Sequence, residues 1–114
     1  MTIIEYVKTK VDIEHEEDDN TFDNRLLIDI ETALAELQQL TELELPDSIT
    51  STTTFEDILK TSDKGLLMLC KTFVGICVRL TFDPPSGSVL TSLEKSKDSI
   101  ASRITIQPKE FYNE

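Results

Sequence analysis

The most constraining feature of the sequence is an apolar run that ends in a pair of prolines. Eleven of the fifteen residues 66–80 are apolar, and on a helix they point to every side. Pro84 lacks the N–H that continues a helix, and each proline disfavours the α region for the residue before it. We therefore predict a central, buried helix over about residues 62–81. A rigid structural corner follows it, formed by Phe82, Asp83, Pro84 and Pro85.

Apolar periodicity predicts three further helices around this one, over about residues 2–11, 21–41 and 87–104. Thr2 and Glu5 have the spacing of a capping box at the start of the first. The second carries an apolar stripe that is a packing seam, either within the subunit or between subunits. This subunit-packing seam includes Phe22, Leu26, Ile30 and Leu37. The inner face of the last helix consists of Val89, Leu90, Leu93, Ile100 and Ile104.

The remaining segments are short. A helical turn is expected near residues 55–60, where Thr54 and Asp57 again have capping spacing. Pro108 blocks a helix, so residues 105–114 are expected to form an extended C-terminal tail after one all-α domain over residues 1–104. Two aromatic residues make this tail a candidate for docking onto a partner, namely Phe111 and Tyr112.

Charge is distributed unevenly along the chain. The net charge is −11, and residues 1–57 hold 16 acids against 3 bases, whereas residues 58–114 hold 6 acids against 8 bases. Binding to nucleic acid needs clustered Lys and Arg, which this chain lacks. The acidic half is expected to face a basic partner, water, or DNA that must pass without sticking. The candidates for a DNA-facing patch are Glu14, Glu16, Glu17, Asp18 and Asp19.

The sequence offers no recognisable catalytic or metal chemistry. His15 stands alone among acids, and no phosphate-binding glycine loop or nucleophile motif occurs. Cys70 and Cys77 are expected to lie about 10 Å apart on one helix, too far for a disulfide. We expect no enzymatic activity, no metal and no cofactor. The apolar run 66–80 is shorter than the roughly 20 residues of a membrane span, so we expect a cytoplasmic protein without a membrane segment.

Two stretches resemble one known family. "LLMLCKTFVGICVRLTFDPPSGSVLTSLEKSKDSIASRI", residues 66–104, is similar to the head–tail connector proteins of tailed bacteriophages, also called adaptor or head-completion proteins. "EYVKTKVDIEHEEDDNTFDNRLLIDIETAL", residues 5–34, looks like the start of the same family, and FDPPSGS is the most specific piece. Helical members often carry an aromatic residue late in the last helix, where this chain has Ser102, Arg103 and Ile104.

The resemblance implies a four-helix subunit in a ring of copies of itself, typically a dodecamer. Such a ring docks below the portal protein in the virion neck, extends the DNA channel, and offers a platform to the next neck or tail-completion protein. The resemblance also implies neither enzymatic activity nor a cofactor, with synthesis in the host cytoplasm. A different class stays open beside it, a small acidic interaction module of the inhibitor, antitoxin or DNA-mimic type.

Overall fold

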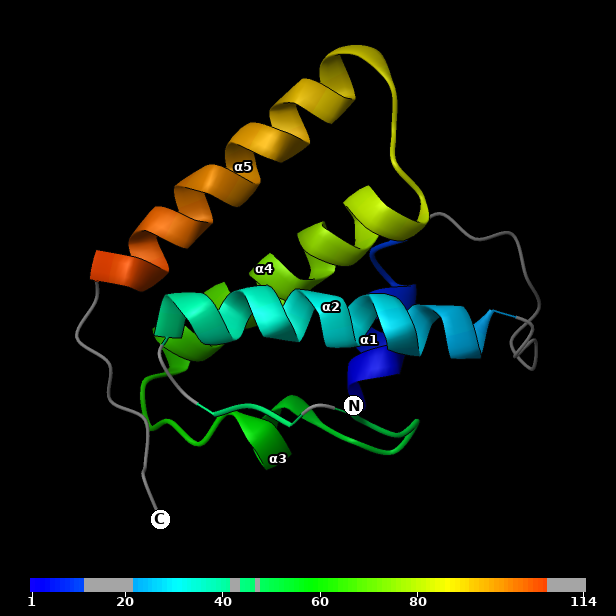
Figure 1. Cartoon of the computed structure of the whole chain (residues 1–114). Coiled ribbons are helices and arrows are strands. Elements are labelled where there is room, and N and C mark those ends of the chain that lie inside the picture. Colours follow the sequence, from blue (N-terminus) through cyan, green and yellow to red (C-terminus); the bar gives the residue numbers. More distant parts are fainter. Residues whose placement is uncertain (12–21, 42–43, 47, 107–114) are drawn as a thin grey trace.

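The structure is a computed structural model that describes residues 1–11, 22–41, 44–46 and 48–106. Within these ranges the chain forms helices and no strand, which confirms the predicted all-α fold. Helices α1, α2, α4 and α5 correspond to the four predicted helices, and α3 to the predicted helical turn. Their bounds are α1 Ile3–Lys8, α2 Asp23–Thr41, α3 Phe55–Ile58, α4 Lys64–Phe82 and α5 Gly87–Ile106 (Figure 1).

Capping boxes start two of these helices, as the sequence predicts. The Glu5 N–H donates to the Thr2 hydroxyl at 3.2 Å, and the Thr2 N–H donates back to the Glu5 carboxylate at 2.8 Å. Thr54 and Asp57 make the same two bonds at 3.1 and 2.9 Å. The bonds from the cap backbone hold the pKa of both carboxyl groups below the usual range. Purely local contacts therefore fix where α1 and α3 begin.

The C-terminal ends of α1 and α5 differ from the predicted boundaries by at least two residues. α1 ends at Lys8 rather than at residue 11, because Thr9 caps it: its N–H and its hydroxyl both donate to the Tyr6 carbonyl, the hydroxyl at 2.6 Å. α5 continues to Ile106, two residues into the segment that we expected to be extended. There the Thr105 hydroxyl donates to a carbonyl one turn earlier at 2.8 Å. The rest of the predicted tail lies outside the described residues.

α4 is the centre of the fold. It contacts α1, α2 and α5, and Figure 1 shows it between α2 and α5. One continuous core joins side chains from all five helices and the loops around α3. Its buried members are Ile3, Ile4, Val7, Val11, Leu26, Ile30, Ala33, Leu34, Leu37, Leu45, Ile49, Phe55, Leu59, Leu66, Cys70, Phe73, Val74, Cys77, Val78 and Ile104.

The prediction that α4 is buried on all sides is only partly correct. Met68 is 67% exposed, although it lies in the apolar run. It is seven residues before Gly75 and therefore on the same face of the helix, two turns earlier. Gly75 is covered by Tyr6 and Lys10, whereas α1 is only six residues long. Met68 therefore lies outside the part of this face that Tyr6 and Lys10 cover.

α4 has 19 residues and is long and apolar enough to cross a membrane, by length and composition alone. The central helix of a packed core has the same composition. Cys70, Phe73, Val74 and Val78 of α4 are each at most 2% exposed within this core. We therefore interpret its apolarity as that of a core helix.

The polar face of α2 has a structural role that periodicity did not reveal. The Gln38 side-chain oxygen accepts a hydrogen bond from the Leu45 N–H at 2.8 Å. The Glu31 carboxylate accepts one from the Ile49 N–H at 3.0 Å. These two bonds hold the segment before α3 against α2, and they allow Leu45 and Ile49 to be buried.

α5 packs less tightly than the sequence predicts. Of its expected inner face only Ile104 is fully buried, and Val89 is 56% exposed. Figure 1 shows the reason, because α5 starts away from α4 and approaches it toward its C-terminal end. Lys97 holds this second half in place, with its ammonium 3.0 Å from the Glu36 carboxylate and 6.0 Å from the centre of the Phe73 ring. The first half of α5 is left to flank an open cleft.

Candidate functional site

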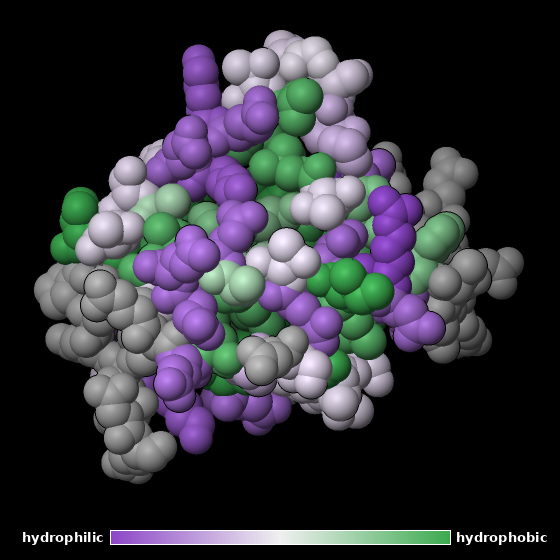
Figure 2. Space-filling model, in the orientation of Figure 1, coloured by the Kyte–Doolittle hydropathy of each residue, from purple (hydrophilic) through white to green (hydrophobic). Residues whose placement is uncertain are grey.

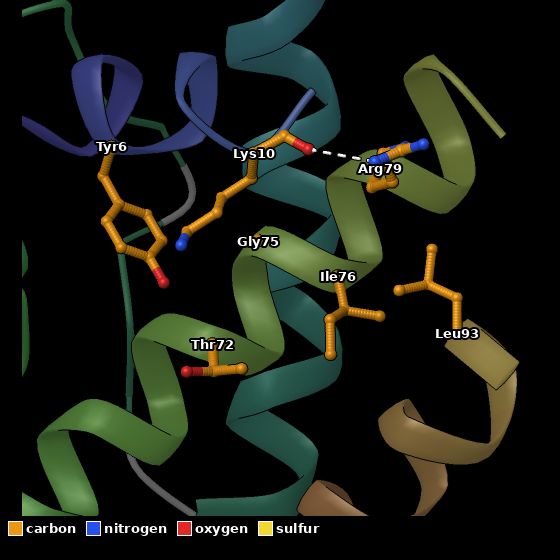
Figure 3. Close-up of a pocket in the computed structure, with 7 residues that line it drawn as sticks. All are labelled: Tyr6, Lys10, Thr72, Gly75, Ile76, Arg79 and Leu93. Atoms are coloured by element: carbon orange, nitrogen blue, oxygen red, sulfur yellow. Dashed lines mark hydrogen bonds between the residues drawn. The ribbon is translucent and has the colours of Figure 1, made fainter. Parts of the chain in front are cut away.

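The cleft lies where α1, α4 and α5 meet. It has a volume of about 230 Å³, and Figure 3 shows α4 forming its floor and Leu93 of α5 facing Ile76 at one side. It is lined by Tyr6, Lys10, Thr72, Gly75, Ile76, Arg79 and Leu93. Three segments that are far apart in the sequence thus build one concave surface.

Gly75 sets the depth of this cleft. A Cβ atom at this position would lie 3.2 Å from Cγ of Lys10 and 3.4 Å from Cε2 of Tyr6. An alanine here would therefore require the Lys10 side chain or the Tyr6 ring to shift by a few tenths of an ångström. An ion pair also holds α1 in place, because the Lys8 ammonium lies 2.7 Å from the Asp23 carboxylate of α2. A glycine within an apolar helix is the one sequence signal that could have indicated this close approach.

The lining combines apolar side chains with positive charge. The Lys10 and Lys71 ammonium groups lie 5.2 and 5.3 Å from the centre of the Tyr6 ring. The Arg79 guanidinium donates to the Lys10 carbonyl at 3.5 Å, as Figure 3 shows. It also donates to the Asp83 carbonyl at 3.1 Å. The seven lining residues include two bases and no acid. In a chain of net charge −11 this is a locally basic, partly aromatic surface.

The predicted corner lies directly beside the cleft. α4 ends at Phe82, and the Asp83 N–H still donates to the Arg79 carbonyl as the helix cap. Pro84 and Pro85 then lead to Gly87, which has φ +66° and starts α5. A left-handed φ favours glycine, and a Cβ here would meet nothing within 4 Å, so the constraint is in the backbone. The sequence prediction did not include this glycine.

Phe82 anchors the corner onto α2. Its ring meets the Phe22 ring edge-on at 5.7 Å, and the Arg25 guanidinium lies 4.6 Å from the ring centre. Arg25 also donates to the Phe82 carbonyl at 3.5 Å. Sequence reasoning missed Arg25, because it lies 57 residues away from the corner that it contacts.

The predicted seam of α2 packs mainly inside the chain. Leu26, Ile30 and Leu37 are fully buried in the core, so they are not available to a second subunit. Phe22 differs, since it is 39% exposed beside Phe82. Of the two alternatives that periodicity left open, packing within the subunit therefore applies to Leu26, Ile30 and Leu37.

Other apolar side chains remain at the surface. Figure 2 shows apolar surface, in green, among hydrophilic side chains over the region where α5 diverges from α4. The large exposed apolar residues of the described chain are Met1, Phe22, Ile28, Met68, Val89 and Ile106. Isolated exposed residues are normal on a protein surface, but six of this size are available for subunit contacts.

Neither cysteine is suited to chemistry. Cys70 and Cys77 are free and buried, and burial raises the pKa of both thiols to about 12. Within the described ranges no three acidic, histidine or cysteine side chains gather in a way that could hold a metal ion. His15, the acidic patch Glu14, Glu16, Glu17, Asp18 and Asp19, and the docking residues Phe111 and Tyr112 lie outside the described residues.

The carboxylate of Asp29 on α2 is buried, and few contacts offset the cost of burying its charge. Asp29 is 9% exposed, and its Oδ2 atom is buried without a hydrogen-bond partner. Burial raises the pKa of this carboxyl group, and the nearby Arg25 opposes the shift only in part. Because the pKa of Asp29 is higher in the folded state than in the unfolded state, its ionised carboxylate lowers the free energy of unfolding at pH values above the folded-state pKa. This destabilisation disappears as the pH falls toward 3.8, the ordinary value, because the carboxyl group then becomes protonated.

Asp29→Asn is therefore expected to raise the free energy of unfolding at pH 7 by about 1 kcal/mol, because it removes a buried charge. The difference from the parent chain should shrink as pH falls toward 3.8, where Asp29 itself becomes neutral. Urea denaturation at pH 7 and at pH 4 measures both effects. Glu94→Gln on the exposed face of α5 is the matched control. An Asp29→Asn chain that is equally or less stable at pH 7 would contradict this account.

Comparison with known proteins identifies the family. A family model described as "Phage connector protein" matches residues 3–110, so the chain belongs to this family. The resemblance drawn from residues 66–104 is thereby confirmed as a likeness to phage head–tail connectors. Membership indicates a structural connector role and a virion component. No curated protein and no solved structure matches the chain significantly.

Proposed function

We propose that copies of this chain form a dodecameric ring below the portal protein, in the neck at the capsid vertex. The ring joins capsid to tail, extends the DNA channel and presents a platform to the next neck or tail-completion protein. The chain is made in the host cytoplasm and has no enzymatic activity, cofactor or membrane segment. The observation that carries this proposal is the match to the phage connector family over residues 3–110.

The shape and surface of the subunit support assembly with itself. In a heterologous interface one surface of each copy meets a different surface of the next, and repeated contacts of this kind can close into a ring. The chain offers two unlike surfaces, the basic cleft and the exposed apolar residues of α2 and α4, of which Ile28 and Met68 are 61% and 67% exposed.

The charge of the chain supports passage of DNA without binding. Residues 1–57 carry 16 acids against 3 bases, and acidic walls do not hold phosphates by counterion release. We propose that the acidic patch of residues 14–19 faces the channel or its rim. The alternative of a small acidic interaction module rests on the same charge alone, and no further observation favours it.

The proposal predicts that the purified chain joins purified portal protein in a complex with many copies of the 12.9 kDa subunit. Light scattering of the mixture measures its mass, and electron microscopy of virion necks shows where the subunits lie. Portal protein alone is the control. A chain that stays at the mass of one subunit beside the portal, and that is absent from virions, would contradict the proposed function.

A further inference from the structure

The basic cleft is sized for side chains rather than for a small molecule. Its volume of about 230 Å³ lies below the range of about 300–1,000 Å³ that is usual for ligand pockets. Ile76 and Leu93 form apolar walls, and the Tyr6 ring adds an aromatic face. An inserted aromatic side chain would find apolar contact and an edge-to-face partner here.

The charged residues at the rim of the cleft indicate which side chains should stand next to such an aromatic residue in the segment that binds. Lys10 and Arg79 line the cleft, and Lys71 lies beside the same Tyr6 ring. The Asp83 carboxylate lies 4.0 Å from the Arg79 guanidinium and offsets part of this charge. Among the described residues no acid forms an ion pair with Lys10 or Lys71. Carboxylates next to the aromatic residue would therefore form charge-assisted contacts with Lys10 and Lys71. The occupant that fits is an aromatic segment with neighbouring acids.

The chain itself contains a segment of this composition. Residues 110–114 read "EFYNE", with Phe111 and Tyr112 between Glu110 and Glu114. The segment follows α5 after a spacer of three residues, 107–109, which include Pro108. An aromatic pair between two acids complements an apolar cleft with basic residues at its rim.

Chain length favours the cleft of a different copy over the cleft of the same subunit. Leu93 precedes Ile106 by thirteen helical residues, a distance of about 20 Å at the usual rise. Phe111 is five residues past Ile106, and a fully extended chain covers at most about 18 Å over five residues. In its own subunit the segment would have to run back along α5 almost fully extended to bring Phe111 or Tyr112 to the level of Leu93. A second copy carries no such limit.

We propose that Phe111 and Tyr112 of one copy bind in the basic cleft of a second copy, with Glu110 and Glu114 near Lys10 and Lys71. This inference rests on the proposed self-assembly and names a contact within it. Each copy gives one segment and receives another, so the contact is heterologous and compatible with ring closure.

A cross-linking experiment with two different chains tests this contact. One chain carries Thr72→Cys in the cleft, and the other, with an affinity tag, carries Asn113→Cys beside the intact aromatic pair. A short bis-maleimide then joins thiols that lie close together. Cys70 and Cys77 are buried, with thiol pKa values raised to about 12, so they should react little. We expect a tagged product with the mass of two chains.

Two control variants make the result specific. Thr32→Cys on the exposed face of α2 replaces Thr72→Cys as a matched threonine outside the cleft, and it should give little product. Phe111→Ala with Tyr112→Ala in the Asn113→Cys chain should abolish the product, since the aromatic pair no longer anchors the segment. Equal yields from Thr72→Cys and Thr32→Cys would overturn the inference, as would a product formed within a single chain that carries Thr72→Cys and Asn113→Cys together.

Light scattering of the same samples separates the two proposals. Multimers without the Thr72–Asn113 product would leave the ring standing and rule out the segment in the cleft. Chains that remain monomeric in the presence of portal protein and give no cross-linked product would rule out both proposals. Multimers with the product, lost in the Phe111→Ala and Tyr112→Ala chain, would support the inference.

Discussion

Phe73→Ala is expected to lower the free energy of unfolding by about 3–5 kcal/mol, the range for deleting a buried phenylalanine side chain. Phe73 is 2% exposed at the centre of α4. Its ring also lies 6.0 Å from the Lys97 ammonium, so the substitution weakens the attachment of α5 as well. Domains of this kind have total stabilities of about 5–15 kcal/mol, so the loss is a large share.

Urea denaturation followed by circular dichroism measures this loss. Phe22→Ala is the matched control, because it removes the same side chain from a position that is 39% exposed. We expect Phe22→Ala to cost about 1 kcal/mol, through its lost contact with the Phe82 ring. Equal losses for the two substitutions would show that α4 is not the centre of the stabilising core.

The parts of the fold that the sequence predicts depend on contacts between near neighbours. Thr2 with Glu5, and Thr54 with Asp57, satisfy backbone groups three residues away, so their spacing in the sequence is sufficient to locate the helix starts. The start of α4 shows the limit of this reasoning. Ser62 was expected to begin it, whereas Asp63 accepts the Leu66 N–H at 3.1 Å and is the cap. Both are good capping residues, and nothing local separates them.

The parts that the sequence did not predict depend on contacts between distant residues. Periodicity shows which face of a helix is apolar, but not which element covers it or how completely. Lys97 and Glu36 meet across 61 positions, and their ion pair brings the second half of α5 to α2. The angle at the corner lifts the first half away, so Val89 is exposed although it belongs to the apolar face.

In the candidate site, too, features that depend on near neighbours were predicted and features that depend on distant residues were not. The four corner residues could be located from the sequence, because proline restricts the chain locally. The cleft could not, since it combines Tyr6, Gly75 and Leu93 from three helices. The predicted acidic patch and the docking residues Phe111 and Tyr112 remain predictions, because they lie outside the described residues.

Replacing both corner prolines, Pro84→Ala with Pro85→Ala, is expected to disrupt the position of α5. Alanine restores two N–H groups and lets α4 continue beyond Phe82, where the prolines now stop it. The unfolded chain also gains backbone freedom, so the free energy of unfolding should fall by about 1–3 kcal/mol. The cleft should change shape with the corner, because Leu93 of α5 and Arg79 of α4 lie on either side of it.

Thermal unfolding and virion assembly together measure this effect. Pro46→Ala provides a matched control, since Pro46 is an exposed proline in a different connection between helices. It should change melting little, because Gln38 and Glu31 hold the segment around Pro46 by hydrogen bonds to other residues. The double-alanine chain should melt earlier. Phage that carry it should build capsids that lack a functional neck, because in the proposed ring a subunit with a displaced α5 cannot repeat one contact. Normal assembly with unchanged melting would mean that Pro84 and Pro85 only link two helices whose relative position is fixed by Ile104 and Lys97 alone.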